Sequence, residues 1–167
     1  YTNSSLMDGV TATLYLLPSA AGSTSSFEYG LTYTGIDGLT VGYAGGDNET
    51  TATNVRESTN LWATYTMDAF TIGVQDNSTD AQTASTDTDF RAYALSYAVS
   101  DELSVSYGAS TVEHENTSLE DQDASAVSFS YVTGGMTISG SMATVDNVGG
   151  TAATDNSGYE LNVSFAF

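Results

Sequence analysis

The most constraining feature of this sequence is a period-2 alternation of large apolar and small polar residues that returns in one segment after another. It is clearest at the end of the chain, where large apolar side chains occupy every second position from Tyr159 to Phe167. Successive side chains of a β-strand point to opposite faces, so such a run forms a strand with one apolar and one polar face. The pattern predicts an all-β fold.

The alternating segments form a repeating unit of strand, short turn, strand and long polar loop. An aromatic residue closes the first strand of each unit, and the spacings between Tyr33, Tyr65, Tyr97 and Tyr131 are 32, 32 and 34 residues. Short turns are expected at 34–38, 66–69, 98–102 and 132–135, and long loops at 45–57, 76–88, 111–122 and 145–156. Because the two kinds of connection alternate, they lie at opposite ends of an antiparallel up-and-down sheet. We count ten strands, and residues 1–6 resemble the tail of a preceding one.

The charge balance restricts the partners of the chain. The formal net charge is −19, because 2 Lys and Arg residues stand against 21 Asp and Glu residues, yet charged residues make up only 14% of the chain. Phosphate binding needs a basic surface, so nucleic acid is excluded as a partner. The carboxylates gather in the long polar connections, which predicts acidic loops. Residues 1–167 have the size of a single domain.

Three features indicate that the apolar face of the sheet meets lipid. Tyr33, Tyr65, Tyr97 and Tyr131 end their strands at a common level, as an interfacial aromatic girdle does. The polar face carries Ser, Thr and Gly in place of Lys and Glu, which suits the crowded inside of a barrel. The strands themselves are almost uncharged. We therefore predict a transmembrane β-barrel, in which a closed sheet pairs every backbone donor and acceptor.

The last strand resembles that of Gram-negative outer-membrane porins, where a C-terminal Phe after alternating apolar residues is recognised by the barrel-assembly machinery. The residues that carry the pattern here are Tyr159, Leu161, Val163, Phe165 and Phe167. The resemblance implies a cleaved secretory signal, location in the outer membrane in contact with its lipid, and periplasmic short turns with extracellular long loops. It also implies a homotrimer and passive diffusion of small hydrophilic solutes and ions.

The sequence departs from the porin pattern in two respects. Porins usually have sixteen strands and one long inward-folded constriction loop, whereas ten strands with loops of similar length are found here. They also place a cluster of Arg and Lys at the constriction, and only Arg56 and Arg91 are basic in this chain. Two readings stay open, the C-terminal part of a sixteen-stranded barrel and a complete ten-stranded barrel. The interrupted strand at residues 1–6 favours the first.

Several carboxylates are candidate site residues. Glu28 and Glu160 have inward parity on their strands, so they are candidates for lining a water-filled lumen that favours cations. The alternative is that both are solvated at the rim. Five other carboxylates are spaced as weak calcium ligands: Asp87, Asp89, Glu120, Asp121 and Asp123. They match no calcium-binding motif, so solvated acidic loops without a cofactor are the stronger interpretation.

Two other classes of function compete with a channel. A barrel hydrolase would need His114, the single histidine, beside a Ser or Asp partner, and no motif supplies one. We therefore predict that the protein is not an enzyme. The main alternative is a secreted or cell-surface structural β-protein, such as an adhesin, fibre or surface-layer subunit, whose apolar face packs in a sandwich. Such a protein would be soluble without detergent.

Overall fold

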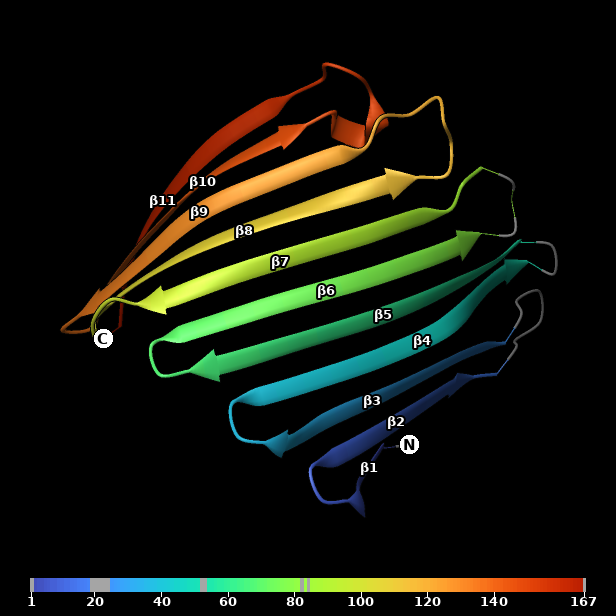
Figure 1. Ribbon diagram of the computed structural model, residues 1–167, viewed down its shortest axis with the longest axis horizontal. Coiled ribbons are helices and arrows are strands. Elements are labelled where there is room, and N and C mark those ends of the chain that lie inside the picture. The colour runs from blue at the N-terminus through green and yellow to red at the C-terminus, as the bar shows by residue number, and fades with distance from the viewer. Residues whose placement is uncertain (1, 19–24, 52–53, 82, 84, 167) are drawn as a thin grey trace.

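The computed structural model describes residues 2–18, 25–51, 54–81, 83 and 85–166. They form one antiparallel sheet of eleven strands, each paired with its neighbours in sequence. The strands are β1 (Thr2–Met7), β2 (Val10–Leu17), β3 (Ser26–Ile36), β4 (Leu39–Thr51), β5 (Asn54–Met67), β6 (Phe70–Ala81), β7 (Thr88–Ala98), β8 (Leu103–His114), β9 (Gln122–Thr133), β10 (Met136–Asp146) and β11 (Asn156–Phe165). A single 3-10 turn, η1 (Val148–Gly150), lies between β10 and β11. Figure 1 shows the strands side by side in chain order, which confirms the up-and-down meander.

The first strand lies in the residues that resembled the tail of a preceding strand. All ten expected strands are present, and Thr2–Met7 adds an eleventh, β1, which pairs with β2 through Thr2 and Thr13. Among the described residues, β1 pairs only with β2, and β11 pairs only with β10. The sheet is therefore open at both sides.

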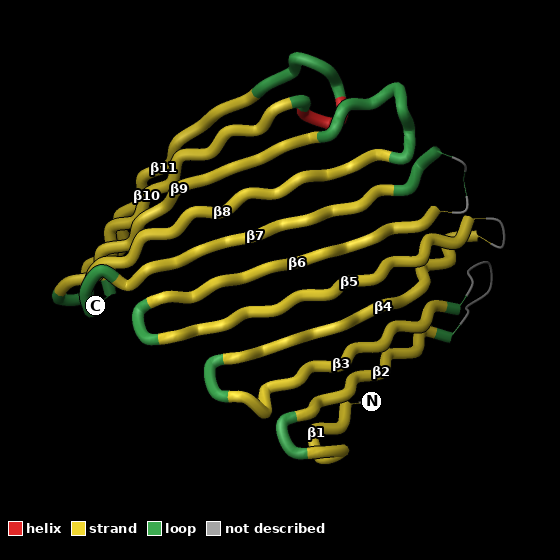
Figure 2. Tube along the Cα trace, viewed as in Figure 1, coloured by secondary structure: helices red, strands yellow, loops and turns green. Residues whose placement is uncertain are grey.

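The connections are segregated as predicted, with the short turns at one end of the sheet and the longer loops at the other (Figure 2). Two-residue turns at 8–9, 37–38, 68–69 and 134–135 join four of the strand pairs. Gly38 has a φ of 74°, and a Cβ built on it would lie 2.3 Å from the carbonyl oxygen of Thr66 near the end of β5. Only glycine meets both demands, so this turn depends on its residue type.

The prediction of long acidic loops was wrong for most of the carboxylates. β4 continues to Thr51, β5 begins at Asn54 and β6 continues to Ala81, so these strands run through sequence that was expected to form loops. Pairing of strands joins backbone groups and does not need apolar side chains. A carboxylate can add to it, since the Phe27 N–H donates to Oδ1 of Asp47 at 2.6 Å. The acidic residues therefore lie largely on strand extensions, where each has a defined face.

The sheet is a single layer, and its apolar face is uncovered. Among the described residues, only the hydrophobic side chains of Val10 and Ala81 are buried, whereas Tyr93 and Leu161 are 58% and 66% exposed. The bulging side carries large apolar side chains, and the hollow side carries Ser, Thr, Gly and Ala. In the described part of the chain, no helix has the length and hydropathy needed to cross a membrane.

The apolar band runs obliquely across the strands, and the aromatic residues that close the strands record its slope. Tyr33 pairs with Val41 of β4, whereas Tyr65 pairs with Leu39, two residues nearer to the short turn at 37–38. The same two-residue step across two strands separates Tyr65 from Tyr97 on β6, and Tyr97 from Tyr131 on β8. A shift of about one residue per strand, with a rise of about 3.3 Å and a strand spacing of about 4.8 Å, corresponds to a strand tilt of about 35°. The band is therefore level when the strands are tilted as in a membrane barrel.

Candidate functional site

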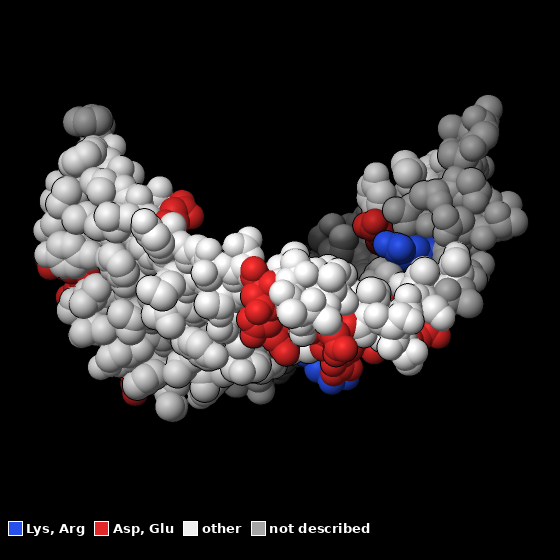
Figure 3. Space-filling model, turned by 90° about the horizontal axis from the view of Figure 1, so that it is seen from above, with Lys and Arg blue, Asp and Glu red and all other residues white. Residues whose placement is uncertain are grey.

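The hollow side of the sheet is the candidate functional surface. Figure 3 views the molecule along the sheet, which is bent into a trough with a hollow and a bulging side. Inward side chains alternate with outward ones on every strand. They are small on most strands, so the backbone itself forms much of the hollow wall.

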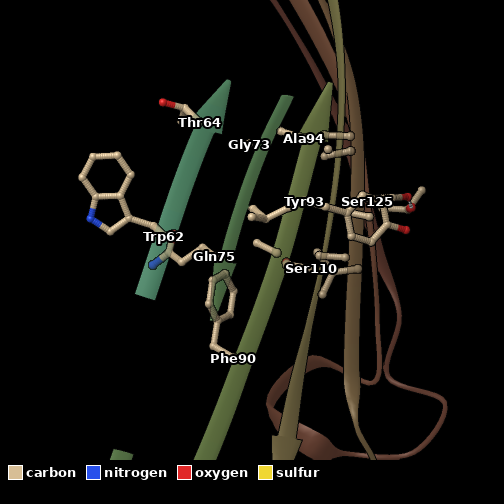
Figure 4. Close-up of a pocket in the computed structure, with 18 of the residues that line it drawn as sticks. Trp62, Thr64, Gly73, Gln75, Phe90, Tyr93, Ala94, Ser110 and Ser125 are labelled. Atoms are coloured by element: carbon tan, nitrogen blue, oxygen red, sulfur yellow. Dashed lines mark hydrogen bonds between the residues drawn. The ribbon is translucent and has the colours of Figure 1, made fainter. Parts of the chain in front are cut away.

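The centre of this wall is an apolar patch that borders a hollow of about 510 Å³. Its floor consists of small residues on β6 to β10, and Trp62 and Phe90 stand at its edge (Figure 4). Trp62 lies over Gly42 of β4, where a Cβ would be 2.3 Å from the indole ring. Trp62 was not among the candidate residues of the sequence analysis. Its register partner, Gly42, was the available signal, because a glycine opposite a large aromatic residue leaves room for the ring.

A hydroxyl-rich surface lies next to this patch, toward the end of the sheet with the short turns. It borders a second hollow, of about 300 Å³, lined on its polar side by Ser104, Ser106, Ser128, Ser130, Ser139, Ser141 and Asn162. The hydroxyl groups of Ser106 and Ser128 are 2.6 Å apart across directly paired positions of β8 and β9. Because these side chains both donate and accept hydrogen bonds, the wall can replace part of the hydration of a polar solute.

Charged side chains are few on the hollow side. Glu28 on β3 and Arg56 on β5 line a third hollow, of about 380 Å³, near the loop end of the sheet. Glu160 on β11 pairs in register with Ser141 and accepts a hydrogen bond from Asn162. The structure thus gives both predicted glutamates inward positions, but it places them on strands far apart in the sheet.

The other arginine lies on the bulging side. The Arg91 guanidinium donates to Glu113 at 2.8 Å and to Asp76 at 3.3 Å, so the ion pairs join three adjacent strands. All three side chains are partly exposed, at 58%, 42% and 61% respectively. Asp76 and Glu113 lie in segments that were expected to be loops, and the extension of β6 and β8 brings both beside Arg91.

The five weak calcium candidates do not form a site. Asp87 caps the backbone N–H of Ala81 at 2.8 Å, and Asp123 accepts from the Thr111 hydroxyl at 2.6 Å. Within the described ranges, no group of three or more His, Asp or Glu side chains is arranged to hold a metal ion. Asp89, Glu120 and Asp121 are among the described residues that form no such group. Sequence neighbours are separated here because each becomes engaged with its own strand or loop.

His114 lies at the inward loop end of β8, in register with Thr88. Its Nε2 is buried without a hydrogen-bond partner, against Gly150 of η1. The imidazole therefore fills the space between β8 and the β10–β11 connection. Neither a Ser nor an Asp side chain of the described residues is hydrogen bonded to it.

Comparison with known proteins identifies the family. The family described as Gram-negative porin matches residues 21–167. The chain belongs to the Gram-negative porin family. It is accordingly an outer-membrane protein, and the all-β barrel architecture expected from the sequence is confirmed. A comparison with curated proteins finds no match.

Solved structures share the fold of this porin at low sequence identity. An anion-selective porin from Comamonas acidovorans superposes with a TM-score of 0.80 at 11% identity, over 96% of this chain and 57% of its own. Outer-membrane expressed OmpT of Vibrio cholerae gives 0.70 at 16% identity, over 95% of this chain and 61% of its own. The porin chain thus spans about three-fifths of the length of these proteins.

The outward face of the terminal strand is apolar. Tyr159, Leu161, Val163 and Phe165 all lie on the bulging side of β11 and are 51–88% exposed. Phe167, the last residue of the predicted assembly signal, lies outside the described residues. The C-terminus is at the end of the sheet with the short turns (Figure 1).

Proposed function

We propose that this porin forms part of the wall of a water-filled channel through which small hydrophilic solutes and ions diffuse passively. The observation that carries the proposal is the division between the two faces of the sheet. The bulging side presents an apolar band that is level at a strand tilt of about 35°, and the hollow side presents small polar residues. A channel wall needs this combination, because lipid covers one face and water the other.

We further propose that additional strands of the protein close the barrel between β1 and β11. An exposed sheet edge leaves backbone groups unpaired, and in a bilayer each such group costs several kcal/mol. Both outer strands have such an edge within the described residues. The partial coverage of the solved porins supports the same reading. A homotrimer, with Tyr33, Tyr65, Tyr97 and Tyr131 as the interfacial girdle, completes the proposed arrangement.

The charges on the hollow side favour cations. Among the described inward side chains, two are negatively charged, Glu28 and Glu160, and one is positively charged, Arg56. The formal net charge of the whole chain is −19. A negative wall and mouth raise the local concentration of cations. The solved porin from Comamonas acidovorans is named anion-selective, so the proposed cation preference rests on the charges of this chain and not on the shared fold.

Electrical recording of the full-length protein in planar bilayers tests this function. We expect stepwise conductance in KCl and a reversal potential of the sign for cations in a salt gradient. Glu28→Gln and Glu160→Gln should each shift that potential toward zero. Anion selectivity would refute the proposed cation preference, and stable solubility without detergent would refute the channel itself.

The structure offers no observation in favour of catalysis. His114 has no acid or nucleophile within hydrogen-bonding distance among the described residues, and such a partner is needed for general-base chemistry. We propose transport without a chemical step and without a cofactor.

A further inference from the structure

The hollow lined by Glu28 and Arg56 brings opposite charges to one small region of the inner wall. Glu28 on β3 is in register with Gly46 on β4, and Gly46 with Ser58 on β5, which is two residues from Arg56. Two strand spacings and a two-residue offset place the Cα atoms of Glu28 and Arg56 about 12 Å apart. The hollow of about 380 Å³ that both residues line also borders Asn60, Asn77 and Asp47, and the carboxylate of Asp47 is already engaged with the Phe27 N–H.

Gly46 directs the glutamate into this hollow. A Cβ on Gly46 would lie 2.9 Å from Cγ of Glu28, so the glutamate side chain lies across the bare backbone of β4 toward β5. A larger residue at position 46 would block that path. The glycine therefore keeps open the space between the two charges.

Neither charge is neutralised by a described neighbour. Within the described ranges, the only ion pairs are those of Arg91 on the opposite face, so Glu28 and Arg56 face the hollow without a charged partner. The two arginines lie on opposite faces, as Figure 3 shows, with one blue group on the hollow side and the other on the bulging side. In addition, Asn60 borders the same hollow, and its Oδ1 is buried without a hydrogen-bond donor.

We infer that this hollow is a binding subsite for small zwitterionic solutes, such as free amino acids. An ammonium group is placed at Glu28, with Asn60 as a second acceptor, and a carboxylate is placed at the Arg56 guanidinium. A solute with both charges can form an ion pair with each of the two side chains. A singly charged solute can pair with only one of them, and the other side chain stays without a counter-charge. The inference rests on the proposed channel, since the solute reaches the subsite through the lumen.

The test uses the full-length protein in planar bilayers and four probes of nearly equal size. The zwitterion is 4-aminobutyrate, the cation 4-aminobutyramide, the anion butyrate and the neutral analogue 4-hydroxybutyramide. The measurement is the concentration of each probe that half-saturates the reduction of open-channel current, together with the excess current noise. We expect the zwitterion to act at the lowest concentration.

Substitutions on the wall then locate the subsite. Arg56→Gln and Glu28→Gln should each raise the half-saturating concentration of 4-aminobutyrate about tenfold, the loss expected for one charge-assisted hydrogen bond. Arg91→Gln is the matched control, because it removes the other arginine, from the bulging side. Glu160→Gln should alter ion selectivity and leave the zwitterion effect in place.

The outcomes separate the subsite from the channel. KCl conductance with equal effects of all four probes, or a zwitterion effect that survives both Arg56→Gln and Glu28→Gln, would overturn the subsite alone. A protein that inserts but shows no KCl conductance would overturn the proposed channel. Loss of the zwitterion effect in Arg91→Gln would place the binding elsewhere and also overturn the subsite.

Discussion

The oblique course of the apolar band can be tested with two single substitutions. Each places a charge at a different position of the same row of paired residues. Leu95 on β7 and Met142 on β10 are joined by successive pairs through β8 and β9, so they belong to the same row of the sheet. Both face outward and both are apolar, with exposures of 44% and 66%. On the outward face of β7, Leu95 is the middle one of three apolar residues. On the outward face of β10, Met142 is the apolar residue nearest the loop end. We compare Leu95→Arg with Met142→Arg.

The geometry gives the expected difference. Three strand steps of about 4.8 Å at a tilt of about 35° raise Met142 about 8 Å above Leu95 toward the loop side. An arginine facing lipid costs about 2–4 kcal/mol at the midplane and about 0–1 kcal/mol near the interface, with the apolar band about 25 Å tall. Leu95→Arg should therefore be more destabilising than Met142→Arg by about 2 kcal/mol, or roughly 30-fold in the folding equilibrium constant.

Reversible unfolding of the full-length protein from lipid vesicles measures this difference. Denaturant titrations can be followed by heat-modifiable gel mobility, with Ser96→Arg on the hollow side of β7 as a control for the introduction of charge itself. Equal costs at Leu95 and Met142 would mean that the row is parallel to the membrane, and the assigned tilt would be wrong. A larger cost at Met142 would refute the placement of the band.

Three further predictions concern single positions. Gly42→Ala puts a Cβ 2.3 Å from the indole of Trp62, so it should cost about 1–3 kcal/mol and change the emission of the only tryptophan, whereas Gly73→Ala, with its nearest contact at 3.8 Å, should leave that emission unchanged. Arg91→Gln should lower the free energy of unfolding by less than about 1 kcal/mol, because its ion pairs are exposed, and a larger loss in denaturant titrations would contradict that view. His114→Ala should leave single-channel conductance unaltered, and a loss of hydrolytic activity in this variant would revive the enzyme hypothesis.

The strands and their faces could be predicted from the sequence because alternation is a local signal. Tyr159 to Phe165 specify a two-faced strand whatever their partners are, and the same holds for the runs that end at Tyr33 and Tyr97. The extent of the strands was not predictable in this way. The segment after Gly45 contains Asp, Asn, Glu and Thr, which are typical of loops, yet backbone pairing with β3 extends β4 to Asp47, and pairing with β5 extends it to Thr51.

Only one of the two charged residues of the candidate site could be predicted from the sequence, because the extent of the strands was not predictable. Parity placed Glu28 inward, because its strand was recognised. Arg56 lay in a segment expected to be a loop, where parity has no meaning, so its approach to Glu28 was missed. The missed signal was Gly46, a residue without a side chain at the register position between them.

One row of directly paired residues across the sheet shows how the charged side chains mark the position of the sheet in the membrane. The row passes from Leu61 on β5 to Asp76 on β6 and then to Arg91 on β7. It changes from apolar to charged between adjacent strands, on one continuous face. Charged side chains are excluded from the hydrocarbon but tolerated at its boundary, so the row crosses the upper edge of the band at that point. In the proposed channel the boundary has no such effect on the opposite face, because water would be present there at every height. The inward Arg56 and Glu28 therefore need no ion pair to be tolerated, and they remain available to a solute.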